Sequence, residues 1–238
     1  MLANLWRIAY LELIFSLRIP ASVMYVVLLP MMLMLLFGGR YSDVGALVMG
    51  LTAMVAGVST LQGVGQVTAG MRHGIWRTIR IAIDPDWLYL AGLVFSRALR
   101  SVVVACVLLI GAYVAFGYVL KGNLALHLGI ILVGSIPFAF LGLLFAYLPR
   151  TPMTGSMLLN LFILGMLAVS GVFAQPSGWL TYVSYASPLT YLVALLRDNG
   201  DPTSRHHMSA WLSTTVLVGW ALAAASATVL LARAREDD

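Results

Sequence analysis

The chain has 238 residues, of which 61% are hydrophobic and 10% are charged, with a mean hydropathy of +0.95 and a net charge of +5. Soluble domains carry about 25% charged residues, so this composition excludes an ordinary soluble protein and predicts an all-α polytopic membrane protein. A membrane-crossing helix takes ~20 apolar residues, so about five to seven spans fit. We expect residues 1–238 to form one transmembrane domain.

Cysteine content and the first residues exclude two further features. The single cysteine, Cys106, allows no internal disulfide, and its apolar surroundings indicate an ordinary packing residue. Residues 1–20 lack the basic start, short apolar core and cleavage site of a secretory signal, so we expect them to stay on the mature protein. The positive charge is explained by membrane topology and gives no reason to expect nucleic acid.

The segment at residues 1–19 mixes apolar side chains with Arg7, Glu12 and Arg18. This pattern is typical of a helix that lies in the membrane interface with its cations toward water. The alternative is a simple lead-in to the first span.

The first two spans are predicted at residues 20–37 and 44–69, joined by a tight turn at 38–43. Pro30 is tolerated in the first span because neighbouring helices satisfy the carbonyl that it frees. The second span has one organised polar face, because Thr52, Ser59, Gln62 and Gln66 lie on one side of a helix. Such a face costs free energy in lipid, so it should contact protein or water. Hydrogen bonds between helices and the wall of a solute pathway both remain open.

Residues 71–87, MRHGIWRTIRIAIDPDW, form the longest charged interruption of the apolar sequence. A basic loop between two spans faces the cytoplasm. We therefore expect a cytosolic loop here, followed by a helix at residues 88–100 that rises from the cytoplasm, with Arg97 and Arg100 at the membrane boundary.

The remaining four spans are predicted at residues 101–120, 124–148, 153–174 and 210–232. Residues 121–123 make an outer turn, and residues 149–152 make a cytoplasmic one. Asn160 is the most polar residue deep in the fifth span, where helix packing is the default interpretation over contact with a substrate.

The segment at residues 175–209 is ambiguous, because residues 179–196 are apolar enough for a seventh span. Serine, threonine and proline interrupt it, and its aromatic residues are those of membrane interfaces. We predict a broken or re-entrant pair of short helices at the outer surface.

If six spans place both termini in the cytoplasm, most of the basic residues lie on the cytoplasmic side. Ten then lie in the cytoplasm, namely Arg7, Arg18, Arg72, Arg77, Arg80, Arg97, Arg100, Arg150, Arg233 and Arg235. Four lie outside, namely Arg40, Lys121, Arg197 and Arg205. An excess of arginine and lysine inside is the expected pattern, and a seventh span would weaken it.

Several kinds of chemistry have no sequence support. The predicted span cores hold no Asp, Glu, Lys or Arg, which argues against an ion- or proton-coupled carrier. The phosphate-binding motif G-x-x-x-x-G-K-[ST] is absent, so ATP could drive this chain only through a partner. Hydrolase and metalloprotease motifs are also absent, and a metal site of histidines with Asp198 and Asp201 is less expected than solvated loop residues.

Two stretches match a known pattern. After the second span, MRHGIWRTIRIAIDP has a central glycine, basic residues and a closing proline, which are Gly74, Arg77, Arg80 and Pro85. Before the last span, SGWLTYVSYASPLTYLVALLR has a Trp-Leu pair, a Pro-Leu-Thr-Tyr run and an arginine, which are Trp179, Leu180, Pro188, Leu189, Thr190, Tyr191 and Arg197. With the order of the spans, these stretches resemble the permease subunit of ABC-2 type transporters, the group that includes daunorubicin-resistance and nodulation-type exporters.

The resemblance implies a second permease copy or a similar permease, and separate ATPase subunits that bind ATP and Mg. No cofactor, catalytic residue or metal site is then expected in this chain. The resemblance also implies that the amino-terminal helix and the cytosolic loop receive the ATPase motion, with coupling residues Arg72, Gly74, Trp76, Arg77 and Arg80. It places the substrate pathway near the first, second and fifth spans, with lining candidates Thr52, Ser59, Gln62, Gln66 and Asn160. The aromatic segment would form an outer gate of Trp179, Tyr185, Pro188 and Tyr191.

The physical character of the loop fits such coupling, because its apolar side chains can enter a groove while its arginines meet acidic rims. The alternative is an arginine cluster that only sets topology. With no charge in the spans, the expected cargo is an apolar or amphipathic drug or lipid that leaves the cytoplasm across the plasma membrane. A polysaccharide or lipid-linked glycan exporter, and a non-transporting scaffold or sensor subunit, remain alternatives.

Overall fold

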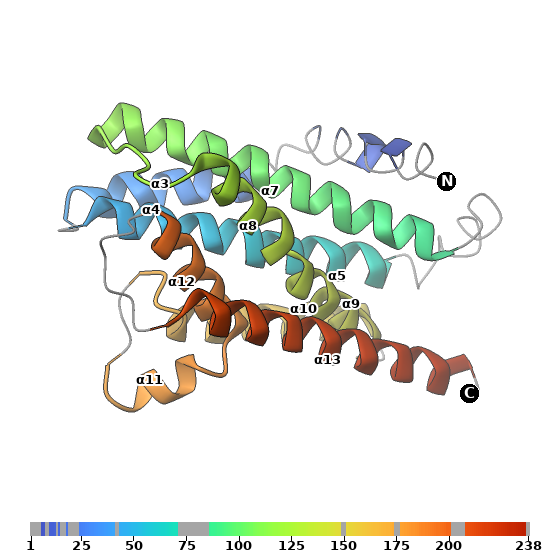
Figure 1. The fold of residues 1–238 in the computed structure, drawn as a ribbon. Coiled ribbons are helices and arrows are strands. Elements are labelled where there is room, and N and C mark those ends of the chain that lie inside the picture. Colours follow the sequence, from blue (N-terminus) through green and yellow to red (C-terminus); the bar gives the residue numbers. More distant parts are fainter. Residues whose placement is uncertain are drawn as a thin grey trace.

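The computed structural model of the protein describes residues 6–7, 10–12, 14, 18, 24–40, 43–70, 86–148, 151–173, 177–200 and 208–236. Within these ranges the regular structure is helical throughout and contains no strand, as the all-α prediction requires. The long helices lie side by side in one bundle (Figure 1).

The first two helical units of the bundle each consist of consecutive helical elements, and we call each unit a rod. The first is a π-helical turn, η1 (Met24–Leu28), followed by α3 (Leu29–Gly38). The second joins α4 (Val44–Met54), a further π-helical turn η2 (Val55–Ser59) and α5 (Thr60–Gly70). The later helices are α7 (Asp86–Phe116), α8 (Leu124–Gly134), α9 (Ile136–Tyr147), α10 (Pro152–Val169), α11 (Trp179–Ser184), α12 (Pro188–Gly200) and α13 (Ala210–Glu236).

Six apolar helical segments follow the order of the six predicted spans. In the part of the chain that is described, four are long enough to cross a membrane, namely Val44–Thr68, Tyr89–Phe116, Leu124–Tyr147 and Ala210–Leu231. The other two are shorter, Val26–Gly38 and Met153–Val169. The protein is therefore a multi-pass membrane protein, and six full crossings stay a prediction.

Helix α7 differs from its predicted form. The sequence predicted a helix at residues 88–100 and a span at 101–120, whereas one continuous helix runs from Asp86 to Phe116. It ends at Gly117, whose φ of +66° favours glycine, and whose N–H donates to the carbonyl of Tyr113. Arg97 and Arg100 lie within this helix and are 8% and 5% exposed, so both side chains are packed against protein, and their position at the membrane boundary stays a prediction.

The α4–η2–α5 rod forms the centre of the bundle, between α7 on one side and α9, α12 and α13 on the other (Figure 1). In its most apolar stretch 83% of the residues are buried, against 11% in α13. Its contact with α9 is close because two glycines meet there, and a Cβ on Gly142 would lie 2.5 Å from the carbonyl oxygen of Leu61 and 3.1 Å from the nitrogen of Gly65. Small residues permit this approach between membrane helices.

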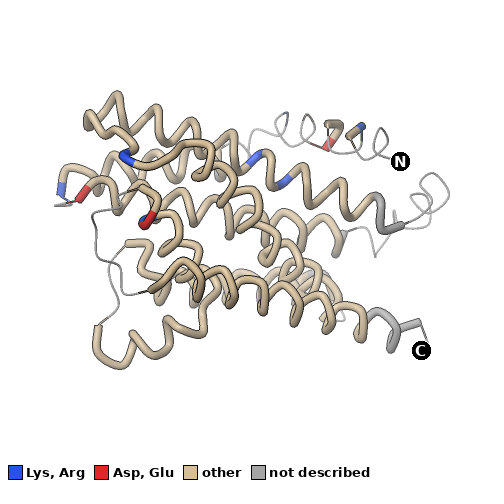
Figure 2. Tube along the Cα trace, in the orientation of Figure 1, with Lys and Arg blue, Asp and Glu red and all other residues tan. Residues whose placement is uncertain are grey.

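The segment before the last span contains two short helices, α11 and α12, separated by a turn at residues 185–187. Two short helices were predicted there, and their position relative to the membrane stays a prediction. Both lie at the end of the bundle opposite the carboxyl end of α13 (Figure 1). Figure 2 shows that α9 and α10, and α13 along its described side chains, carry no charged residue.

Candidate functional site

A cavity of about 210 Å³ lies between the first rod, the second rod and α10. The residues that line it are Val26, Leu29, Pro30, Leu33, Met54, Val55, Val58, Ser59, Leu164, Leu167 and Phe173. These helices correspond to the first, second and fifth predicted spans. Leu164, which is 65% exposed, places the cavity beside an open face of the bundle.

Both π-helical turns contribute walls to this cavity, η1 through Val26 and η2 through Val55, Val58 and Ser59. Proline has no N–H, so Pro30 cannot donate to the carbonyl of Val26 four residues earlier, and this accounts for the altered register of η1. Single π-helical turns inside α-helices occur frequently at functional sites. The cavity therefore has an irregular backbone on two of its three sides.

Ser59 is the polar side chain among the described residues that line the cavity. Its hydroxyl donates to the carbonyl of Val55 in the same helix. It also lies 3.4 Å from the hydroxyl of Ser101, which is itself 3.4 Å from the hydroxyl of Thr60 and donates to the carbonyl of Arg97 at 3.1 Å. Hydroxyl groups thus connect the cavity wall to α7.

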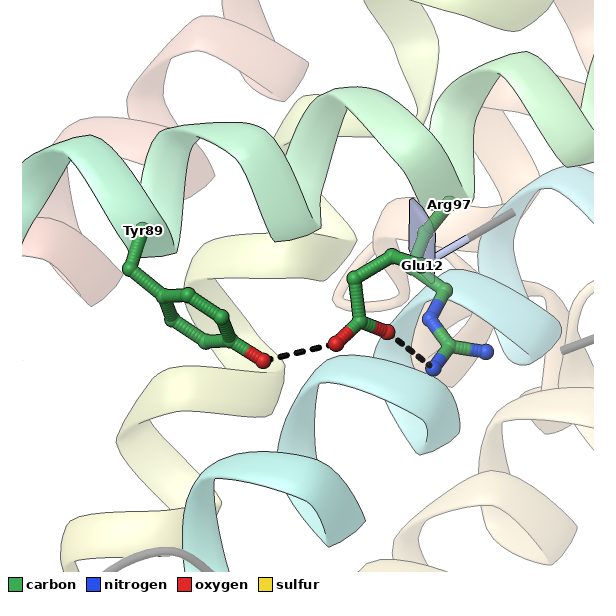
Figure 3. Close-up of polar contacts among 3 residues, drawn as sticks. All are labelled: Glu12, Tyr89 and Arg97. Carbon is green, nitrogen blue, oxygen red and sulfur yellow. Dashed lines mark hydrogen bonds and ion pairs between the residues drawn. The ribbon is translucent and has the colours of Figure 1, made fainter. Parts of the chain in front are cut away.

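Two residues of α7, Tyr89 and Arg97, form a polar cluster with Glu12 of the amino-terminal segment (Figure 3). The hydroxyl of Tyr89 donates to a carboxylate oxygen of Glu12 at 2.7 Å, and an Nη of Arg97 lies 3.6 Å from the other oxygen. Arg97 also packs against Gly63 of α5, where a Cβ would lie 3.1 Å from its Cδ. The ion pair compensates part of the cost of burying the guanidinium group.

An aromatic contact supports the same attachment. The rings of Trp6 and Phe95 lie 6.1 Å apart, centre to centre, with planes inclined by 56°. Tilted pairs at such distances are favourable. Residues of the predicted interfacial helix therefore contact α7 at two points, one polar and one aromatic.

Arg197 connects α12 to two other segments. An Nη donates to the carbonyl of Gly171 at 2.7 Å, and the guanidinium group also donates to the carbonyl of Ala46 at 3.3 Å. A Cβ on Gly50 would lie 2.5 Å from the carbonyl oxygen of Val172, so the segment after α10 presses directly on α4. Because Phe173 of this segment lines the cavity, the position of α12 helps to fix one cavity wall.

The structure brings one of the predicted lining residues, Ser59, into the cavity. Thr52 is fully buried and donates to the carbonyl of Val48 at 2.7 Å, and Gln62 is half-buried on α5. Gln66 is exposed and borders a separate narrow gap against α10, and Asn160 is exposed on α10 itself. A role for these residues in the pathway stays a prediction.

The other predicted sites have different outcomes. All the predicted coupling residues lie outside the described residues, namely Arg72, Gly74, Trp76, Arg77 and Arg80. Of the predicted outer gate, Trp179 and Tyr185 are exposed, whereas Pro188 and Tyr191 are buried. The hydroxyl of Tyr191 donates to the carbonyl of Tyr185 at 2.8 Å, so it fixes the turn between α11 and α12.

Sequence reasoning missed the π-helical turns, the Glu12 cluster and the role of Arg197. Pro30 was a signal for the first turn, since it removes one hydrogen bond from its helix. The arginine of the Pro-Leu-Thr-Tyr stretch was noticed, but its two carbonyl acceptors lie 26 and 151 residues away in sequence. No sequence spacing indicates the contact between Glu12 and α7, which joins segments 77 residues apart.

The comparisons with known proteins identify the family of the chain. A search of curated proteins finds no match. The sequence profile of the ABC-2 type transporter matches residues 4–200, which is most of the chain and includes every helix except α13. The chain therefore belongs to the ABC-2 type transporter family.

Proposed function

We propose that this chain is the permease subunit of an exporter that moves an apolar or amphipathic compound out of the cytoplasm, driven by separate ATPase subunits that bind ATP and Mg. The observation that supports this most directly is the cavity with two π-helical walls between the first rod, the second rod and α10. Its lining is apolar except for Ser59, which suits a cargo with large apolar surface and few polar groups.

The cavity is small for a complete binding site. Sites for small molecules have volumes of about 300–1,000 Å³, and this cavity has about 210 Å³. It lies beside exposed apolar side chains of α3 and α10, among them Met32, Leu161 and Leu164. A second permease copy on this face would cover these side chains and enlarge the site, which supports a pathway between two copies.

Energy would reach this site from the cytoplasm. The ends of α5 and α13 and the start of α7 lie at one end of the bundle (Figure 1), so residues 71–85 connect two helix ends there. We place this end in the cytoplasm, with both chain termini, and the ATPases against it. The contacts of Glu12 and Trp6 with α7 give the amino-terminal segment a physical route to the bundle.

Filling the cavity tests the proposal. Val58 is 4% exposed and lines the cavity, so Val58→Phe adds volume where a cargo would lie. The matched control is Val114→Phe on α7, where the side chain is 78% exposed. Both variants would be purified with their ATPase, reconstituted in vesicles and assayed for ATP turnover and for transport of a fluorescent amphipathic dye.

We expect Val58→Phe to reduce transport at least tenfold and Val114→Phe to leave it unchanged. Equal transport by both variants would overturn the assignment of the cavity. If no ATPase copurifies in mild detergent, a scaffold or sensor role replaces transport, and if only a lipid-linked glycan is moved, the cargo class is wrong.

A further inference from the structure

A second, larger cavity lies on another side of the bundle, between α8, α12 and α13. Its volume is about 740 Å³, and it shares no lining residue with the cavity beside Ser59. We call it the α8–α13 groove. The proposed transport function does not use it.

The walls of the α8–α13 groove are apolar over most of its length, with Leu126 and Ile130 on α8 and Leu217 and Leu222 on α13. Gly129 lines the groove and places no side chain in it. A Cβ at this position would meet no atom within 4 Å, so the space beside Gly129 is open. The lining on α13 extends from Ala210 to Leu222, which corresponds to about 18 Å of helix. This is close to the depth of one leaflet, half of a hydrocarbon core of ~30 Å.

Apart from Thr214, whose hydroxyl donates to the carbonyl of Ala210 one turn earlier in α13, the polar residues among the described lining gather at one end of the groove. Asn123 precedes α8, and Asp198 and Asn199 belong to the last turn of α12. The side-chain amide of Asn199 donates to the carbonyl of Asn123 at 3.1 Å, and the side chain of Asn123 accepts from the N–H of Leu126 at 3.2 Å. One end of the groove, where α8 begins and α12 ends, therefore carries amide and carboxylate groups. The rest of the groove is lined mainly by apolar side chains.

We propose that the α8–α13 groove binds one acyl chain of a membrane phospholipid, with the headgroup beside Asn123, Asp198 and Asn199. The groove lies against α13, which is the most exposed of the four long apolar helices, so the medium that reaches it is lipid. Its length, its apolar walls and its single polar end match a chain that enters from one leaflet. This proposal depends on the chain being a membrane protein, and not on transport.

A photoreactive phospholipid tests the proposal. The full-length protein would be reconstituted in phosphatidylcholine vesicles that contain a trace of phosphatidylcholine with a diazirine on one acyl chain. After irradiation, mass spectrometry locates the labelled residues. A diazirine near the carboxyl end of the chain should label the Leu126 and Ala210 region, and one near the methyl end should label Ile136 and Leu222.

Two glycine variants provide the comparison. Gly129→Leu fills the groove, whereas Gly219→Leu places the same side chain on α13 where a Cβ also meets no atom and where no groove residue is replaced. We expect Gly129→Leu to reduce labelling of groove residues at least tenfold and Gly219→Leu to leave it within twofold. Both changes replace an unhindered helical glycine, so folding should survive, and circular dichroism would verify this.

Three results would overturn the proposal. The first is labelling spread evenly over all exposed helices, which indicates bulk lipid only. The second is equal labelling in Gly129→Leu and wild type. The third is loss of labelling when an excess of the transported dye is added, which would make the groove a cargo site and leave the proposed transport function standing.

Discussion

Arg197 illustrates how one side chain can hold segments that the sequence keeps apart. Arginine presents several donors in a rigid planar fork, so it can serve two carbonyls at once. Here those carbonyls belong to Ala46 at the start of α4 and to Gly171 after α10. With 8% exposure, the guanidinium group depends on these acceptors for compensation of its buried charge.

We predict that Arg197→Ala lowers the free energy of unfolding by at least about 3 kcal/mol, because two carbonyls lose their donor and hydrogen bonds of charged groups contribute about 1.5–3 kcal/mol each. Arg197→Lys should recover less than half of this loss, since a lysine cannot reproduce the fork. Denaturant titration in detergent micelles would measure both. Arg40→Ala, at an exposed position, is the control and should leave the midpoint unchanged. Equal midpoints for all three variants would contradict the prediction.

The predicted polar face of the second span depends on the hydrogen-bond register of the helix as well as on its position in the sequence. Thr52, Ser59, Gln62 and Gln66 share one side only if the helix is regular throughout. The π-helical turn at Val55–Ser59 has wider i→i+5 hydrogen bonding, so it rotates the residues after it relative to Thr52. Hydropathy predicted the span itself, but it contains no information on this change of hydrogen-bond register.

Length and apolarity were sufficient to predict the order of the helices. They were not sufficient to predict that Arg97 is buried, because its partners Glu12 and Gly63 belong to other segments of the chain. Such contacts are tertiary and leave no periodic signal.

The first π-helical turn can be tested directly. Pro30→Ala restores the missing N–H, so we expect η1 to become regular α-helix and the cavity wall at Val26 to rotate. Transport of the fluorescent dye should fall at least fivefold, while thermal stability stays equal or rises. Pro137→Ala is the control, because Pro137 has the same position at the start of α9 but does not belong to the described lining of this cavity. Unchanged transport by Pro30→Ala would show that transport does not require the π-helical turn.

In the assembled transporter, we propose that a second copy binds along α10. Asn160 is exposed on this helix among apolar neighbours such as Met157 and Leu161, which are 65% and 68% exposed. An amide that faces lipid lacks partners, and contact between two copies would supply them.

We therefore predict that cysteines at Leu161 form disulfide-linked dimers. The change would be made in a Cys106→Ala background, because Cys106 is the only native cysteine. Leu230→Cys is the matched control, since Leu230 is 67% exposed on a different helix, α13. After mild oxidation in membranes, gel electrophoresis should detect dimers for Leu161→Cys and few for Leu230→Cys. Equal yields would mean random collision and would remove the support for pairing through α10.

The burial of the α4–η2–α5 rod also constrains how the protein is made. The rod leaves the ribosome before the helices that cover it. Gly142 contacts the backbone at Leu61, but it is synthesised roughly 80 residues later. At ~5–20 residues per second this delay is on the order of 4–16 seconds. During that interval the side of the rod formed by Leu61 and Gly65 lacks its final neighbour in α9. Biogenesis therefore needs the insertion machinery, or a chaperone in the membrane, to shelter the rod until the later helices arrive.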